Sequence, residues 1–231
     1  MATRFRRRPG LQALPSFLST PWTGASCFKV VHEFNERFVR AITSVAREGD
    51  QGTMPEVVWI HRDLWPNLDA AAIRHMSQCP FLLANIHFRS ATWWQQARNV
   101  ASSPGGAPGP VPLFSGERAV ELMWEAILIA RRTIRVDTRD AAILLGMSSD
   151  VASVVADLGL GDLQHIAHHH HRHLRPRWEH RSAFWGKLLD TASHDDREAL
   201  YELRLYAFQM ADADSGPAAS TPGDTEGVRH G

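Results

Sequence analysis

Residues 115–136, with the sequence SGERAVELMWEAILIARRTIRV, decide the fold class. Ser115 is a residue type that commonly caps the N-terminus of a helix. Beyond it, apolar residues recur every three or four positions, which places them on one face of a helix. These residues are Val120, Met123, Ile127, Ala130 and Ile134. The stretch therefore predicts a long helix whose apolar stripe packs in a core.

Shorter helices are predicted after this one. Thr138 can cap a short helix that Gly146 closes in a left-handed turn, and Ser148 or Ser149 can cap another that ends at Gly159. Asp162 can cap a fourth helix that runs into a histidine-rich segment. Two more helices are predicted around 184–189 and 198–210.

The N-terminal half gives similar but weaker signals. An apolar stripe from Cys27 to Val45 predicts a helix that stops near Gly49. Asn67 or Asp69 can cap a helix through Met76, and Ser90 can cap one that carries Trp93 and Trp94. The run 57–60 is either a strand or an extended segment, and the pattern does not decide which. A mainly α fold is expected.

Residues 101–112 contain three glycines and four prolines and cannot hold a regular element. We place a linker and domain boundary there. The expected organisation is a basic flexible arm (1–25), a mainly helical accessory or partner-binding domain (26–100), the linker (101–112), a helical domain (113–210) and a disordered tail (211–231).

Composition narrows the classes of function. Among 231 residues, Lys plus Arg and Asp plus Glu each total 25, so no global positive field favours a polyanion. Two cysteines exclude a disulfide framework and a four-cysteine zinc site within one chain. No apolar run approaches the ~20 residues that span a bilayer, and the short apolar stretch after the N-terminal arginines is broken by Pro15. A cytoplasmic protein without a membrane partner is expected.

Residues 127–179 resemble the FlhD family of flagellar transcriptional activators. Ala130 and Arg132 lie near the end of the long helix, and Leu145-Gly146 follows at a fixed spacing. The remaining matches are Met147, Ala152, Ala156, Leu158, Leu160 and Ala167. The glycine is suited to a left-handed C-cap, and the alanine pair at i and i+4 permits close helix approach.

The resemblance implies a transcriptional activator that acts on DNA as a homo-oligomer with a zinc-binding, FlhC-like partner subunit. Residues 1–112 have no counterpart in the short chain typical of that family. Leu174 stands where the family has a cysteine able to link paired subunits, so a covalent dimer is not expected.

A basic cluster after the fourth predicted C-terminal helix is the candidate DNA-binding site. It comprises Arg172, Arg175, Arg177, Trp178 and Arg181, with Glu179 the only opposing charge. Arginines can contact phosphates and base edges. The alternative is a solvated helix end with a core tryptophan, and in either case we expect the arginines to be exposed.

The histidine-rich segment places six imidazoles within nine residues. Four of them, His165, His168, His169 and His171, have spacings that put pairs on one helix face and are the candidate metal ligands. Neither cysteine nor enough carboxylates lie nearby to complete a catalytic site. We expect a solvated face without a dedicated cofactor that can take up Zn or Ni adventitiously.

No motif indicates an enzyme. His61-Arg62-Asp63-Leu64 imitates a kinase catalytic loop, but Leu68 occupies the position where that loop needs asparagine. The favoured interpretation is a DNA-binding transcriptional regulator resembling FlhD. The alternatives are a protein-interaction adaptor without DNA contact and a histidine-rich metal-binding protein; salt-dependent DNA binding would separate the first two.

Overall fold

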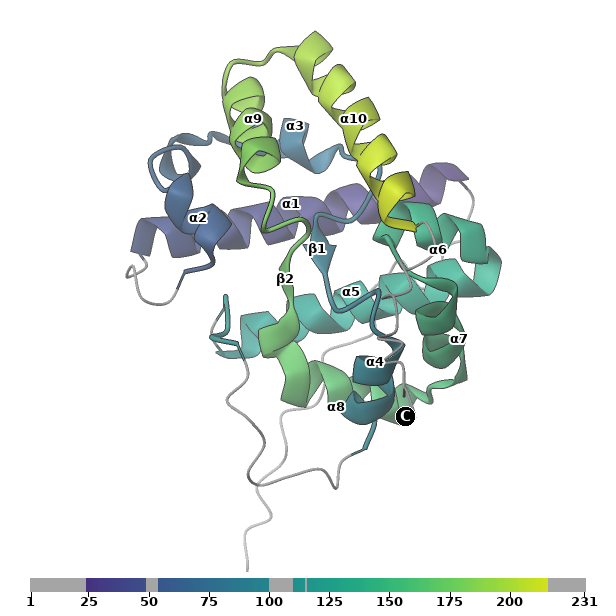
Figure 1. The fold of residues 1–231 in the computed structure, drawn as a ribbon. Helices are drawn as coiled ribbons and strands as arrows, with labels where there is room; N and C mark the ends of the chain where they lie inside the picture. The colour runs from purple at the N-terminus through teal and green to yellow at the C-terminus, as the bar shows by residue number, and fades with distance from the viewer. Residues whose placement is uncertain (1–23, 49–53, 100–109, 115, 216–231) are drawn as a thin grey trace, which may run out of the picture.

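The computed structural model describes residues 24–48, 54–99, 110–114 and 116–215, and the expected mainly α fold is confirmed (Figure 1). Ten α-helices lie in these residues: α1 Gly24–Glu48, α2 Glu56–Ile60, α3 Ala70–Ser77, α4 Ala91–Ala97, α5 Gly116–Val136, α6 Thr138–Leu145, α7 Ser149–Asp157, α8 Leu160–His170, α9 Ser182–Ser193 and α10 Arg197–Ser215. Two short 3-10 turns, η2 (Trp65–Asn67) and η3 (His171–His173), complete the helical elements.

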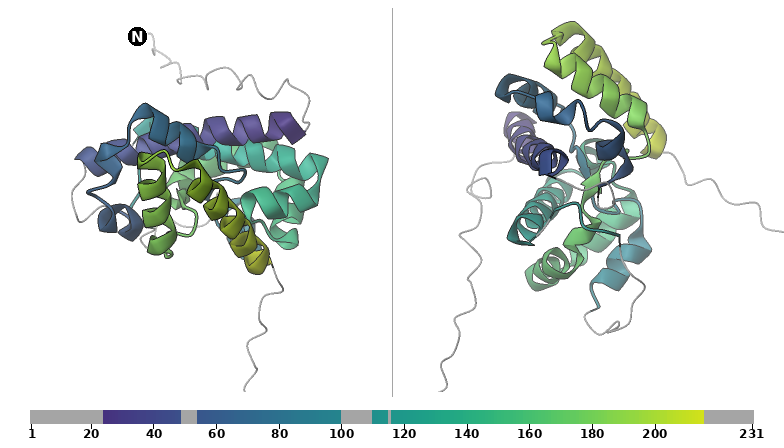
Figure 2. Two further views of the ribbon diagram at one scale, coloured as in Figure 1. Left: turned by 90° about the horizontal axis from the view of Figure 1, so that it is seen from above. Right: turned by 90° about the vertical axis from the view of Figure 1, so that its left-hand side faces the viewer.

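The long helices α1 and α5 lie side by side across the middle of the molecule (Figure 1). Helix α3 packs on α1, and α8 packs on α5. Seen nearly end-on in the right-hand view of Figure 2, α1, α5 and α8 stack in one layer. Helices α9 and α10 pack against each other at one end of the molecule.

Two strands of two residues each cross in front of this layer. They are β1 (Ala84–Asn85) and β2 (Arg175–Pro176), which pair antiparallel. In the register, Ala84 faces Pro176 and Asn85 faces Arg175. This pairing joins segments from the two halves of the chain.

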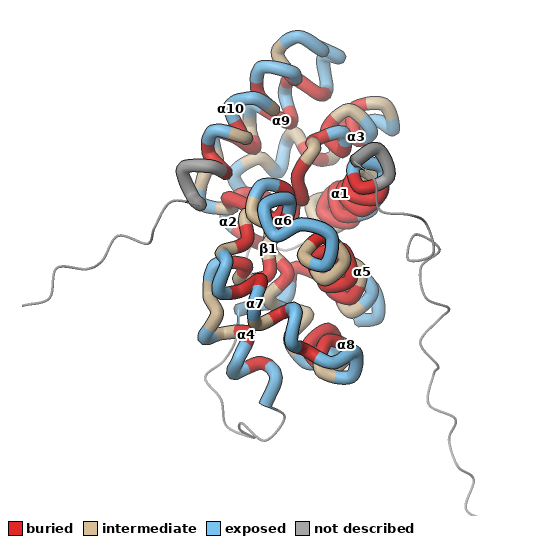
Figure 3. Tube along the Cα trace, turned by 90° about the vertical axis from the view of Figure 1, so that its right-hand side faces the viewer, coloured by how far each residue is buried: buried red, intermediate tan, exposed pale blue. Residues whose placement is uncertain are grey.

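The hydrophobic core is continuous across the predicted boundary at 101–112. Phe34 and Phe38 of α1 are fully buried in the same cluster as Met123 and Ile127 of α5. Figure 3 shows the buried faces of α1, α5 and α8 turned inward and the exposed faces outward. The division into two domains stays a prediction. In the structure, residues on both sides of the predicted boundary belong to one core.

Several predicted caps are confirmed. The side chain of Asp69 accepts a hydrogen bond from the backbone N–H of Ala72, and Ser90 accepts one from that of Trp93. Ser148 caps α7, and Gly146 ends α6 with a φ of 67°. Because a left-handed backbone strains any residue with a Cβ, glycine is favoured there.

Two caps were predicted wrongly by a few residues. Asp137, and not Thr138, caps α6, because its carboxylate accepts from the N–H of Arg139. Helix α8 begins after Gly159, and Asp162 sits inside its first turn, where its carboxylate accepts from the Gly159 N–H. A carboxylate in the first turn of a helix can accept hydrogen bonds from backbone N–H groups at the N-terminus, as a capping residue does. The sequence pattern therefore placed the start of α8 about one turn too late.

Other expectations differ at the margins. The undecided run 57–60 is helical, as part of α2. Helix α10 continues to Ser215, past the expected start of the tail at 211. Ser115, most of the arm, most of the linker and residues 216–231 lie outside the described residues. Within the part that is described, no helix is long and apolar enough to cross a membrane.

Candidate functional site

The central arginine of the predicted DNA-binding cluster is a core residue. Arg177 is only 5% exposed, and its Nη1 donates to the Leu144 carbonyl at the end of α6. Its guanidinium carbon lies 4.4 Å from the ring centroid of Trp178 and 5.6 Å from that of Phe81. The expectation that this arginine is exposed is wrong, because a cation at a helix C-terminus can be buried when carbonyls and aromatic faces receive it.

Arg177 gives a second reason for a glycine in the turn after α6. A Cβ on Gly146 would collide with the guanidinium of Arg177. The glycine therefore satisfies two requirements, the left-handed backbone and the close approach of a buried cation. The sequence predicted the first requirement and gave no sign of the second.

Arg175 is engaged by two partners within the fold. Its Nε donates to a carboxylate oxygen of Glu179 at 2.9 Å, and its Nη1 donates to the Val111 carbonyl at 3.1 Å. Its side chain is 21% exposed. Arg175 thus fastens the segment before α5 to β2 and is not displayed as a free cation.

The other members of the cluster do not form one exposed surface with these two. Trp178 is buried, with ring contacts to Phe81 and Phe184, as the core-tryptophan alternative predicted. Arg172 is exposed and Arg181 is half-buried. Contact of these five residues with DNA stays a prediction, and Arg172 is the member of the cluster that is exposed.

The four candidate metal ligands do not converge. His165 and His169 lie on one face of α8 with ring centroids 4.3 Å apart. His171 instead hydrogen-bonds through Nδ1 to the carbonyl oxygen of His168. In the described ranges, no group of three or more His, Cys, Asp or Glu side chains is arranged to hold a metal ion. Adventitious binding of Zn or Ni stays a prediction.

A different set of histidines is brought together by the fold. The Nε2 of His87 and the Nδ1 of His173 lie 2.9 Å apart and share a hydrogen bond. Trp93 stacks on His87 with ring centroids 4.7 Å apart and contacts His170 and His173. This cluster, His87, Trp93, His170 and His173, joins α4 to the end of α8.

The cluster favours neutral imidazoles. Burial, followed by the neighbouring His87, lowers the pKa of His173 to about 4. Burial is also the main cause that lowers the pKa of His87 and of His170. The histidine-rich segment was singled out by sequence as a solvated face, but its last members hold α4 in place.

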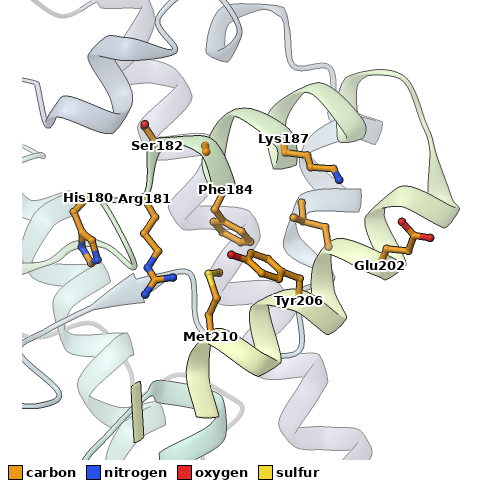
Figure 4. Close-up of a pocket in the computed structure, with 10 residues that line it drawn as sticks. His180, Arg181, Ser182, Phe184, Lys187, Glu202, Tyr206 and Met210 are labelled. Atoms are coloured by element: carbon orange, nitrogen blue, oxygen red, sulfur yellow. The ribbon is translucent and has the colours of Figure 1, made fainter. Parts of the chain in front are cut away.

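A hollow on the surface lies between α9 and α10, and sequence analysis did not find it (Figure 4). We call it the α9–α10 groove. Its volume is about 650 Å³, and the residues that line it are His180, Arg181, Ser182, Ala183, Phe184, Lys187, Glu202, Leu203, Tyr206 and Met210. Phe184, Tyr206 and Met210 gather in the space between the two helices.

Helix α10 also exposes three large apolar or aromatic side chains, of which only Tyr206 lines the groove. Tyr201 is 61% exposed, Leu205 47% and Tyr206 51%. Large apolar side chains gathered in a hollow, as Phe184, Tyr206 and Met210 are, indicate a contact surface, whereas scattered ones do not. The apolar residues of α10 could have indicated a contact surface in the sequence. Because they lie on two sides of the helix, the sequence alone does not tell which side faces the core.

Charged side chains lie at the edge of the α9–α10 groove. Arg181 and Lys187 line it, while Glu202 is the one carboxylate among the lining residues. The twelve-residue helix α9 begins at Ser182, beside Arg181, so its positive end faces the same side. The two cysteine thiols take no part, because both are buried and burial raises the pKa of each to about 11.

Comparison of the chain with protein-family models, with curated proteins and with solved structures gave no match.

Proposed function

We propose that this protein is a non-enzymatic regulatory protein that acts by binding a protein partner in the α9–α10 groove. The observation that carries the proposal is the joining of an apolar floor with a cationic edge in one open hollow. Aromatic residues that stand in such hollows are the usual anchors of protein contacts. The resemblance of residues 127–179 to FlhD-type activators supports a regulatory role.

The occupant that fits this groove is an acidic amphipathic helix of the partner. Two helices that pack against each other can leave a groove into which a third helix lays its apolar face. Phe184, Leu203 and Met210 would receive that face. The exposed Lys187 would meet a carboxylate on its flank, and Glu202 would disfavour a purely basic segment at the opposite edge.

Under this proposal, the arginine cluster no longer carries the function. Arg177 is committed to the core, and Arg175 to Glu179 and Val111. A regulator of the FlhD type that reaches DNA would then do so through its partner subunit. Direct DNA contact is the second candidate, and the exposed Arg172 is the residue that favours it.

The proposal can be tested with two synthetic helical peptides that share one apolar face, one carrying glutamates and the other lysines on the opposite face. Fluorescence polarisation should give a Kd of about 10–100 μM for the acidic peptide and much weaker binding for the basic one. Tyr206→Ala should weaken binding more than about tenfold. Tyr201→Ala is the matched control, because Tyr201 lies on the same helix outside the groove, and it should change binding less than about threefold.

Equal binding of both peptides, or equal effects of the two variants, would refute the groove as the contact. A parallel titration with duplex DNA tests the second candidate. Direct phosphate contact predicts affinity that falls steeply between about 50 and 200 mM salt. An Arg172→Ala variant should then reduce the salt slope by about one unit.

A further inference from the structure

The two halves of the described chain repeat one order of elements. The first copy, residues 24–97, has α1, then α2 with η2, then α3, β1 and α4. The second copy, residues 116–193, has α5, then α7, α8, β2 and α9 in the same order. Helix α6 is the main element of the second copy without a counterpart in the described part of the first.

The buried positions of the two copies correspond at nearly constant spacing. In the long helices, the equivalent residues are 88 positions apart: Val31, Phe34, Phe38 and Ile42 correspond to Ala119, Leu122, Ala126 and Ala130, and all are buried. In the next helices the spacing is 90: Leu68, Ile73 and Met76 correspond to Leu158, Leu163 and Ile166. A shared pattern of burial over two helices indicates a shared packing scheme.

The backbone after each strand repeats an uncommon conformation. His87 has a φ of 45° and Trp178, which lies 91 positions later, has a φ of 54°. A positive φ is uncommon in bulky residues. In each copy the N–H three residues on closes the turn: Ser90 donates to the His87 carbonyl at 2.9 Å, and Arg181 to the Trp178 carbonyl at 2.8 Å.

A tryptophan anchors the last helix of each copy at the same place. Trp94 and Trp185 are also 91 positions apart, and both are fully buried. The indole N–H of Trp94 donates to the His87 carbonyl, and that of Trp185 to the Arg177 carbonyl. The two acceptors differ by one position, because the equivalent of His87 is Trp178, but in each copy the indole is bonded to the backbone at the turn that follows the strand.

The strand pairing has the symmetry of a two-fold axis. Ala84 and Arg175 are equivalent at a spacing of 91, as are Asn85 and Pro176. Exchanging the copies therefore turns the pair Ala84–Pro176 into the pair Asn85–Arg175, and both pairs are present. A homodimer built around two crossing strands has this arrangement.

Each copy gives its last helix to the other. Helix α9 of the second copy packs on α2 and α3 of the first, where His61 Nε2 lies 2.7 Å from the Ser182 carbonyl oxygen and Trp65 contacts Trp185. Helix α4 of the first copy packs on α7 of the second. There the Ser148 N–H donates to the Phe88 carbonyl.

We infer that the chain is a tethered pseudo-dimer, in which two copies of one helical unit complete each other by exchanging their last helices. The surface formed by the short strand and the last helix of each copy is an interaction surface whose partner is a second copy of the unit. Residues 100–109, which carry most of the predicted linker, then serve only to connect the two copies, whereas Leu113 and Phe114 after them belong to the core. This inference does not depend on the proposed function.

The test is to cut the tether and ask whether the interface persists. A protease site is introduced within residues 100–109 of the full chain, the chain is cleaved, and the two fragments are separated in denaturant. On mixing after removal of denaturant, they should form a 1:1 complex with the helicity of the uncut protein. Alone, the second-copy fragment should be either unfolded or a dimer, because its core lacks the partner copy.

A pair of matched variants distinguishes the contribution of the exchanged helix α9 to reassociation from a general loss of stability. Trp185→Ala, which removes the contact with Trp65, should weaken reassociation more than about tenfold. Trp59→Ala is the control, because Trp59 is only partly buried and stacks with Arg62 of its own copy; it should weaken reassociation less than about threefold. A second-copy fragment that is monomeric and fully folded alone would overturn the inference, as would fragments that fail to reassociate.

Discussion

Substitution of Arg177 by alanine tests whether the arginine cluster is structural. The change removes a charge-assisted hydrogen bond from Arg177 to the Leu144 carbonyl oxygen. That oxygen also accepts from the Leu82 N–H, so we take the lower end of the usual range for such a bond, about 1.5 kcal/mol. The change also removes a desolvated cation–π contact with Trp178, worth about 1–2 kcal/mol, and the packing of a buried stem. We expect a loss of about 3–4 kcal/mol in the free energy of unfolding.

The assay is thermal unfolding followed by circular dichroism at 222 nm. For a chain of this size, about 3–4 kcal/mol corresponds to a fall in Tm of roughly 6–16 °C. Arg172→Ala is the matched control, because Arg172 is exposed in the same segment, and it should change stability by less than about 0.5 kcal/mol. If the two variants have equal stability, Arg177 is not a core residue and the assignment of the cluster to the fold fails.

Three further predictions concern other parts of the fold. Gly146→Ala should destabilise by at least about 1 kcal/mol more than Gly116→Ala in denaturant titrations, because both glycines have a positive φ but only the first would place a Cβ against Arg177; equal losses would mean that Arg177 yields freely. Folding lowers the pKa of His173 to about 4, so the neutral imidazole stabilises the folded state. This contribution to the free energy of unfolding is present above about pH 6.5 and is lost as the pH falls toward 4. Melting temperatures across that window should fall, and His173→Leu should flatten the dependence while the exposed His168→Leu leaves it unchanged; an unflattened profile counts against the cluster. Chelation should leave helicity and Tm unaltered, because the candidate ligands do not converge, whereas a loss reversed by zinc would restore the metal-binding alternative.

Local signals in the sequence predicted the helices well. Asp69, Ser90 and Gly146 act within one or two turns of themselves, so their roles could be inferred without knowing the fold. The run 57–60 could not be assigned, because four apolar residues fit a buried strand and a buried helical turn equally. The pairing of β1 with β2 joins segments 91 positions apart and left no local trace.

The candidate site was predicted less well, because charge says little about burial. Arg177 looked like the centre of an exposed patch, but the end of α6 and two aromatic rings enclose it. The α9–α10 groove was missed because it exists only once two helices are placed beside each other. The repeat was hidden as well, since the two copies share buried positions and backbone turns much more than residue identities.

The most direct test of the account maps where an acidic partner helix binds. In a ¹⁵N-labelled sample of the full chain, titration with the acidic amphipathic peptide should shift backbone amides mainly within residues 180–187 and 202–210, the two ranges that contain the lining residues of the α9–α10 groove. The amides of residues 165–173, which carry most of the histidine-rich segment, should move little. Shifts centred on residues 165–177, or spread without a focus, would contradict the assignment of the partner site.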